Sequence, residues 1–383
     1  MKKKGILKTI LINIGIFLGL LILLDIIIIS GWETRRFINY LKEDVFNTKA
    51  ELLDARAFLP NYKDASWAKE YFNDFNTLKN DNYKSYIGWR KKKYESKYIN
   101  IDSSGIRITP QPELKDSIIK YVFLGGSTMW GTGAPDNGTI PAFFAEIGNG
   151  LYDVKNFGES GYRAFQSYIY LMLQFNKGLK TDWVITYDGV NEAVGYLQSN
   201  EPVSTYAESR MREKLQKKDG LSKTVTDLTY KNFFLGPVLN TVNRIKNKRV
   251  VIPKEKIILN EKRTDEVART LLDAWSAMND LSEKNNAHFL AVLQPNVAVG
   301  SPNKSYLEFD EYQNLMIQTY GQLYDHVRKL LQEDIKYYKL RNKVLDLTYS
   351  LDGEEKYYID WCHVSPNGNK VIAEKISERV INK

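Results

Sequence analysis

Short apolar segments alternate with amphipathic segments over residues 119–383. Apolar runs of strand length occur at 120–125, 153–157, 182–187, 287–293 and 343–347. Apolar residues recur with helical spacing at about 139–149, 163–177, 264–285, 308–333 and 366–381. Strands that alternate with helices are typical of a parallel α/β sheet. The pattern therefore predicts a five-stranded parallel sheet covered by helices, with an insertion of no clear period at about 195–260.

The N-terminal part of the chain has a different pattern. Apolar residues run from Thr9 to Gly31, broken by Asn13 and Asp25, which is roughly the length of a helix that crosses a bilayer. Four lysines precede this run, whereas basic and acidic residues balance after it. The positive-inside rule therefore predicts a single-pass anchor with a cytoplasmic N-terminus and a periplasmic or cell-surface remainder. A cleaved signal peptide is the alternative, but the run is long and no A-x-A cleavage site follows it.

Charge and cysteine content narrow the classes of function. The chain carries 54 Lys+Arg against 46 Asp+Glu, a net charge of +8 that suggests a nucleic-acid partner. However, 13 Lys/Arg and four Asp/Glu fall within Ser209–Lys256, and four more lysines precede the apolar run. The rest of the chain is therefore net acidic, and we expect no nucleic-acid binding there. The single cysteine, Cys362, excludes an intrachain disulfide.

Three candidate groups follow predicted strands. Gly125-Gly126-Ser127 ends the first strand, and a glycine turn there exposes a serine whose neighbouring backbone N–H groups can stabilise an oxyanion. Its alternative is a serine that only caps a helix. Gly161 follows the second strand and offers an unobstructed N–H, while Asn191 follows the third and offers an amide donor. Each could instead be an ordinary turn residue.

The fourth candidate group lies on a late loop before the last helix. Asp360 and His363 are three residues apart, so the carboxylate can orient the imidazole and leave its other nitrogen free as a base. A loop pair or a metal-ligand set is the alternative. We interpret His288 and His326 as structural. Cys362 is interpreted as a small buried residue whose side chain points away from that of His363.

In order and spacing, these four segments resemble the SGNH (GDSL-type) esterase/lipase superfamily, which is named for a Ser, a Gly, an Asn and a His in four blocks. Here those residues are Ser127, Gly161, Asn191 and His363, and the resemblance covers about 119–381. Asp102-Ser-Ser-Gly-Ile-Arg107 and Leu293-Gln-Pro295 also resemble elements of membrane-anchored bacterial members. Two positions depart from the usual pattern. Gly126 replaces an aspartate and Glu192 replaces another, without loss of a catalytic group.

The resemblance implies a flavodoxin-like three-layer α/β/α fold that carries a Ser-His-Asp triad. Ser127 would be the nucleophile, His363 the general base and Asp360 the group that orients it. The oxyanion hole would be formed by Ser127, Gly161 and Asn191. No cofactor and no metal are implied.

We therefore expect an anchor at 1–31, a helical stalk and lead-in at 32–118 that packs on the catalytic domain, and an SGNH hydrolase domain at 119–383. The expected function is a membrane-anchored extracytoplasmic hydrolase that removes O-acetyl or other short acyl groups from carbohydrate or lipid esters. An O-acyltransferase of envelope polysaccharide and a non-catalytic envelope assembly protein are the alternatives. The basic insertion could be a solvated face, a cap over the site, or a surface that faces anionic headgroups or polymer. The aromatic residues of 67–89 either pack or line a carbohydrate groove.

Overall fold

The computed structural model describes residues 9–10, 12–17, 20, 54–78, 81–199, 201–205 and 259–381. It divides the chain into two compact units, of which the second contains Leu53–Met211 and Pro253–Lys383. The fold and the site below belong to this second unit. Most of the predicted membrane segment and most of the basic insertion lie outside the described residues. Among the residues that are described, no helix has both the length and the apolar character needed to cross a membrane.

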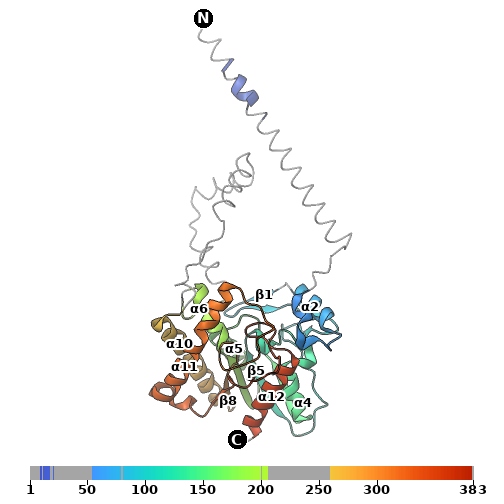
Figure 1. Ribbon diagram of the computed structural model, residues 1–383, viewed down its shortest axis with the longest axis vertical. Helices are drawn as coiled ribbons and strands as arrows, with labels where there is room; N and C mark the ends of the chain where they lie inside the picture. The colour runs from blue at the N-terminus through green and yellow to red at the C-terminus, as the bar shows by residue number, and fades with distance from the viewer. Residues whose placement is uncertain are drawn as a thin grey trace. The chain divides into compact units, whose positions relative to one another are not determined.

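A five-stranded parallel sheet forms the centre of the second unit (Figure 1). Its strands are β5 (Ile119–Gly125), β6 (Tyr152–Asn156), β7 (Trp183–Asp188), β8 (His288–Leu293) and β9 (Val344–Asp346). They lie in the order β6-β5-β7-β8-β9, which is the flavodoxin-like order 2-1-3-4-5. The predicted sheet is confirmed, and each strand boundary falls within one residue of its expected place.

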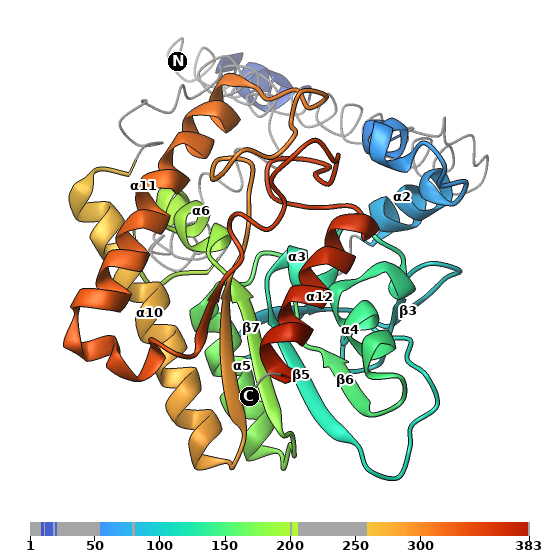
Figure 2. The ribbon, with the colours of Figure 1, turned by 60° about the horizontal axis from the view of Figure 1, so that its bottom comes forward.

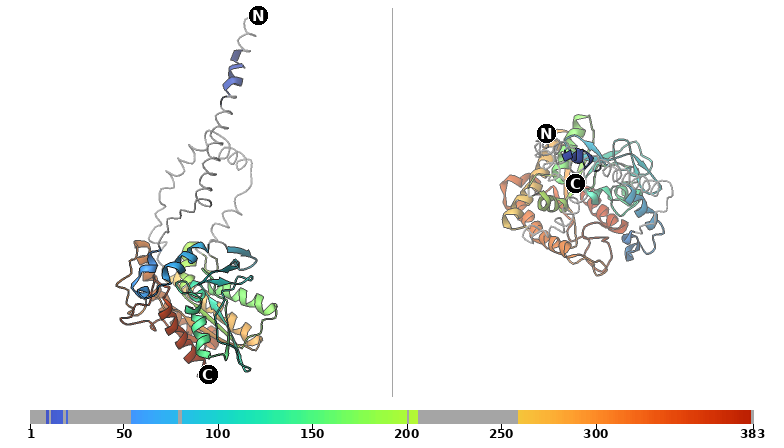
Figure 3. Two further views of the ribbon diagram at one scale, coloured as in Figure 1. Left: turned by 90° about the vertical axis from the view of Figure 1, so that its right-hand side faces the viewer. Right: turned by 90° about the horizontal axis from the view of Figure 1, so that it is seen from above.

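Helices cover both faces of this sheet (Figure 2). They are α4 (Ile140–Gly148), α5 (Ala164–Asn176), α10 (Glu261–Lys284), α11 (Glu311–Glu333) and α12 (Pro366–Ile381). Alternation along β5 explains the layers. Phe123 packs with Phe144 of α4 and Ile376 of α12, whereas Val122 belongs to the core cluster that contains Leu271 of α10. The views of Figure 3 agree with this arrangement, in which α12 lies beside α4.

The described part of the sheet domain also contains shorter elements. They are α3 (Ser127–Trp130), the 3-10 turns η3 (Asp136–Gly138) and η5 (Ile335–Leu340), and α6 (Val190–Ser199). The predicted aperiodic insertion begins at about residue 195, but α6 continues to Ser199. The first residues of that insertion are therefore helical.

The lead-in is not simply a helical stalk. In its described residues, the helical elements are η1 (Ala55–Phe58), η2 (Pro60–Tyr62) and α2 (Ala68–Thr77). Residues 81–101 instead form β1 (Asp81–Lys84), β2 (Gly88–Lys91), β3 (Tyr94–Glu95) and β4 (Asn100–Ile101), in two antiparallel pairs. The prediction of a helical lead-in is therefore wrong for these residues. Strands of two to four residues are too short to produce a recognisable hydrophobic alternation.

The lead-in packs on the sheet domain through an aromatic cluster. Tyr71 and Phe72 of α2 are fully buried with Trp130 of α3 and with Ile359, which immediately precedes Asp360. The backbone of Arg107 also forms an isolated bridge with Asn156 at the end of β6. The lead-in therefore contacts the segments that carry the predicted site.

Candidate active site

A strained glycine turn places Ser127 at the carboxyl edge of the sheet. Gly125 ends β5 with a φ of 147°, and a Cβ at this position would lie 2.5 Å from the carbonyl oxygen of Tyr187. Only glycine fits such a position without displacing β7. Gly126 then caps α3, and Ser127 is the first residue of that helix.

Ser127, His363 and Asp360 form one continuous chain of hydrogen bonds. Ser127 Oγ lies 2.7 Å from His363 Nε2, and His363 Nδ1 lies 2.7 Å from Asp360 Oδ2. The other carboxylate oxygen of Asp360 accepts the backbone N–H groups of Cys362, at 2.9 Å, and His363, at 2.8 Å. These two bonds fix the carboxylate in place, so that it holds the imidazole in one orientation.

The electrostatics of this pair suit a general base. Burial raises the pKa of Asp360, but the charge of the His363 imidazolium and the hydrogen bonds outweigh it and lower the pKa to about 2. The carboxylate is therefore ionised at neutral pH and accepts the Nδ1–H of His363, which leaves Nε2 to accept the Ser127 hydroxyl. The side chain of His363 is 17% exposed, so a substrate can reach it.

The predicted oxyanion donors keep hydrogen-bonding capacity in the structure. The backbone N–H groups of Ser127 and Gly161 donate no hydrogen bond to any described residue, and Gly161 has a φ of 77°. Asn191 Nδ2 donates one hydrogen to the carbonyl oxygen of Tyr162 at 2.8 Å, which leaves its second hydrogen free.

Gly126 makes room for the Asn191 amide. A Cβ at Gly126 would lie 2.2 Å from Asn191 Nδ2, so the amide lies directly against the residue that precedes Ser127. A side chain at position 126 would therefore displace the Asn191 amide.

Glu192 has a structural role that the sequence did not reveal. It is buried, and its Oε1 accepts the Ala164 N–H at 2.8 Å while its Oε2 accepts the Gly189 N–H at 2.9 Å. The side chain therefore ties the start of α5, which follows Gly161, to the start of α6, which carries Asn191. Nothing in the sequence around Glu192 indicates this pair of hydrogen bonds.

Arg90 of the lead-in supports the loop that carries Gly161. Its guanidinium is buried and donates to the carbonyl oxygens of Phe157 at 2.9 Å and Gly105 at 3.0 Å, with the Glu159 carboxylate 3.6 Å away. The sequence gives no sign of this role for Arg90. That residue opens the basic run Arg90–Lys93, which has the composition of a solvated surface.

Arg107 supports the segment that follows Ser127. Its buried side chain donates to the carbonyl oxygens of Trp130 at 3.0 Å, Gly131 at 2.8 Å and Ala134 at 2.7 Å, and it pairs with Asp136 at 2.9 Å. Through Arg107, the sequence motif that ends at this residue therefore stabilises the segment that follows the candidate nucleophile.

Cys362 corrects one expectation. Its side chain is buried, as predicted, but its sulfur lies 3.6 Å from His363 Nδ1 and so does not point away from that residue. Burial and the charge of Asp360 raise the pKa of the Cys362 thiol well above its usual value, so the group stays a thiol.

One group in the described part of the chain brings metal-ligand atoms together. It consists of Asp360, Cys362 and His363, whose ligand atoms lie within 4.8 Å of one another. Because Asp360 and His363 bond to each other, their hydrogen bond already accounts for this geometry. The remaining histidines have structural contacts. The ring of His288 packs 4.8 Å from that of Trp183, and His326 bonds Asp265 at 2.8 Å.

The chain matches no protein-family model and no curated protein. Among solved structures it is similar to a carbohydrate acetylesterase family member from Sinorhizobium meliloti, with 11% identity, a TM-score of 0.38, and coverage of 69% of this chain and 97% of that chain. It is similar to a member of the lipolytic protein G-D-S-L family from Veillonella parvula, with 12% identity, a TM-score of 0.35, and coverage of 68% and 97%. It is also similar to a lipase from a goat rumen metagenome, with 15% identity, a TM-score of 0.38, and coverage of 68% and 97%. The likeness thus extends over about two thirds of this chain, at low sequence identity.

Proposed function

We propose that this chain is a serine ester hydrolase of the SGNH type. The observation that carries the proposal is the hydrogen-bonded chain from Ser127 through His363 to Asp360. The backbone N–H groups of Ser127 and Gly161 and the free hydrogen of the Asn191 amide are the proposed oxyanion donors. A nucleophile, a base, an orienting carboxylate and oxyanion donors are the groups that acyl transfer requires.

The mechanism follows from these positions. His363 Nε2 takes the hydroxyl proton as Ser127 Oγ attacks the ester carbonyl, and the oxyanion receives the hydrogen bonds of the three donors. The intermediate collapses when the bond to the leaving oxygen breaks, and the imidazolium gives that oxygen its proton. Water then attacks the acyl-serine ester, with His363 again acting as base, and releases the acid and Ser127.

The proposed setting is the outer side of a membrane. The apolar run from Thr9 to Gly31 and the four lysines before it support an anchored, extracytoplasmic enzyme. Its proposed substrates are O-acetyl or other short acyl esters of carbohydrates or lipids.

The test uses the detergent-solubilised full chain with a fluorophosphonate probe and p-nitrophenyl acetate. We expect labelling and hydrolysis by the parent protein, and loss of both in Ser127→Ala. Ser104→Ala is the matched control, because Ser104 is an exposed turn residue, and this variant should retain both signals. Absence of labelling at Ser127 would contradict the proposal and favour the non-catalytic alternative. Labelling with turnover only in the presence of a sugar acceptor would instead identify an acyltransferase.

A further inference from the structure

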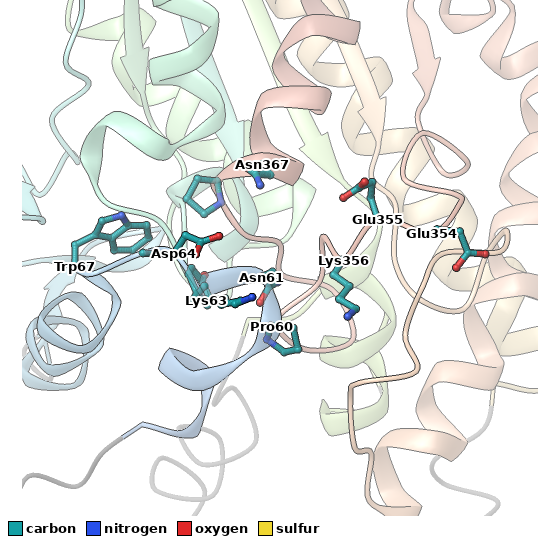
Figure 4. Close-up of a pocket in the computed structure, with 12 residues that line it drawn as sticks. Pro60, Asn61, Lys63, Asp64, Trp67, Glu354, Glu355, Lys356 and Asn367 are labelled. Carbon is teal, nitrogen blue, oxygen red and sulfur yellow. The ribbon is translucent and has the colours of Figure 1, made fainter.

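A cavity of about 570 Å³ lies beside the segment that leads to Asp360. Figure 4 shows Trp67 at one end of this cavity and Glu354 at the other, with Asn61 and Lys63 between them. Asn61 Nδ2 donates to the carbonyl oxygen of Tyr358 at 2.9 Å. The lead-in is thereby joined to the chain two residues before Asp360.

A second cavity of about 500 Å³ adjoins the first. Trp67 and Pro366 line both cavities, so the two meet at these side chains. We call them together the Trp67 groove. Pro366 opens α12, three residues after His363. Each cavity has the volume of a small-molecule site.

The indole of Trp67 is held rigidly in this groove. It is partly exposed, and its ring packs edge-on against Tyr62, with centroids 5.6 Å apart, and against Tyr71, at 5.9 Å. A fixed aromatic face loses little conformational entropy when it contacts a flat apolar surface such as the face of a sugar ring.

The rest of the first cavity is polar and contains charged side chains that form no ion pair with any described residue. Lys63, Asp64, Glu355 and Lys356 are exposed and make no ion pair with any described residue. Such groups, placed beside an aromatic ring, can hydrogen-bond hydroxyl, amide or amino groups. A long acyl chain would need a continuous apolar wall, which this cavity lacks.

The net negative charge of the groove narrows the class of ligand further. The first cavity contains three carboxylates, those of Asp64, Glu354 and Glu355, against two lysines, and Glu146 adds a fourth carboxylate in the second. A polyanion would meet more repulsion than attraction here.

We propose that the Trp67 groove binds a linear polysaccharide that is neutral or carries amino groups, with one sugar ring on the indole. The claim that this polysaccharide carries the ester substrate rests on the proposed hydrolase function, whereas the binding of the polysaccharide to the groove does not. The groove would hold the polymer while one of its acyl groups reaches Ser127.

A kinetic experiment separates the groove from the chemistry. We expect Trp67→Ala and Lys356→Ala to lower kcat/KM for O-acetylated xylo-oligosaccharide, the former on the order of tenfold, mainly through KM, with p-nitrophenyl acetate turnover unchanged. Trp67→Phe retains a ring and should be affected less. Tyr83→Ala, which removes a 76% exposed aromatic outside the groove, is the matched control. Equal losses on both substrates, or no loss on either, would overturn the proposal.

A binding experiment distinguishes failure of the groove from failure of the hydrolase. Full-length Ser127→Ala is titrated calorimetrically with non-acetylated xylohexaose, chitohexaose and a polyuronate hexamer. We expect binding of the first two, weaker binding of the third, and reduced affinity when Trp67→Ala is added. If these hold while p-nitrophenyl acetate is not hydrolysed by the parent, the groove stands and the hydrolase fails. Unchanged affinity in the Trp67→Ala background, or preference for the polyuronate or for a fatty acyl ester, would overturn the groove proposal.

Discussion

The Asn191 amide is the side-chain donor nearest the residue before the candidate nucleophile. We expect Asn191→Ala to lower kcat for p-nitrophenyl acetate by about 10²–10³, with little change in KM, because the donor acts on charge that develops only in the transition state. Steady-state kinetics measure the effect. Since Asn191 also bonds the carbonyl oxygen of Tyr162, thermal melting must show that the variant is folded. A folded variant with unchanged kcat would remove Asn191 from the oxyanion hole.

Asp188, at the end of β7, makes stability depend on pH. Burial and the neighbouring charge of Glu192 raise the pKa of Asp188 from 3.8 to about 8. The folded protein therefore keeps a proton that the unfolded chain releases above about pH 4, so stability falls as pH rises from there through pH 8.

Asp188→Asn should remove this dependence, because an amide resembles the protonated carboxyl and can still accept the hydrogen bonds of Thr186 and Trp275. We expect the variant to gain stability relative to the parent as pH rises from 5 to 9, by at least about 1.4 kcal/mol, the value of one pKa unit. Urea unfolding at both pH values measures the difference. A constant difference across this range would show that Asp188 is ionised in the folded protein.

At the scale of elements, strand β2 supports the loop that carries Gly161. Arg90→Met would leave the buried Glu159 carboxylate without its counter-ion, although it would keep the backbone N–H bonds of Lys91 and Ser160. Breaking a buried ion pair costs about 3–5 kcal/mol. We expect that loss of unfolding free energy in urea, together with reduced activity. Adding Glu159→Gln removes the stranded charge and should restore part of the stability. Arg56→Met, which alters a more exposed arginine of the lead-in, is the comparison.

The opposite result would also be informative. If Arg90→Met is as stable as Arg56→Met, the buried pair contributes nothing to the free energy of unfolding, and the other contacts of the lead-in with the sheet domain account for its packing there.

The sheet and its covering helices could be predicted because apolar periodicity decides them. Five apolar runs of strand length alternate with helical patterns. The predicted boundaries of these strands and helices lie within three residues of the observed ones. The short strands of residues 81–101 could not be predicted, because strands of two to four residues show no recognisable alternation. In the same way, no local pattern separates Arg90, which is buried, from Lys91 to Lys93 beside it.

The site was predictable for a related reason. Carboxyl ends of parallel strands meet at one edge, so Ser127, Gly161 and Asn191 had to converge once the sheet was drawn. His363 lies 236 residues after Ser127, and only the four-block resemblance connected them in advance. The direction of the Cys362 side chain was predicted wrongly, because the turn that wraps Asp360 around the backbone N–H groups of residues 362 and 363 has no signature in sequence.

At the scale of the whole molecule, the uneven distribution of charge along the chain predicts the orientation in which it is inserted into the membrane. We expect the chain to stay in the membrane fraction after a high-salt wash, with its C-terminus digestible by protease added outside spheroplasts. Replacing Lys2, Lys3, Lys4 and Lys8 by glutamate should invert or abolish insertion, because these lysines supply the bias. Replacing four lysines within Ser209–Lys256 is the matched control and should not change orientation. A C-terminus protected in the parent would place the site in the cytoplasm.

The order of strands has a consequence for how this protein can fold and change. β7 pairs with β8, and the first pair of that register, Trp183 and His288, closes a loop of more than 100 residues. The entropic free-energy cost of closing a flexible loop rises by only about 0.6 kcal/mol for each doubling of loop length. Evolution could therefore lengthen or shorten the connection between these strands at little thermodynamic cost. The limit is kinetic, since a central pairing between such distant residues forms slowly and leaves the edge of β7 open to misassociation until β8 arrives.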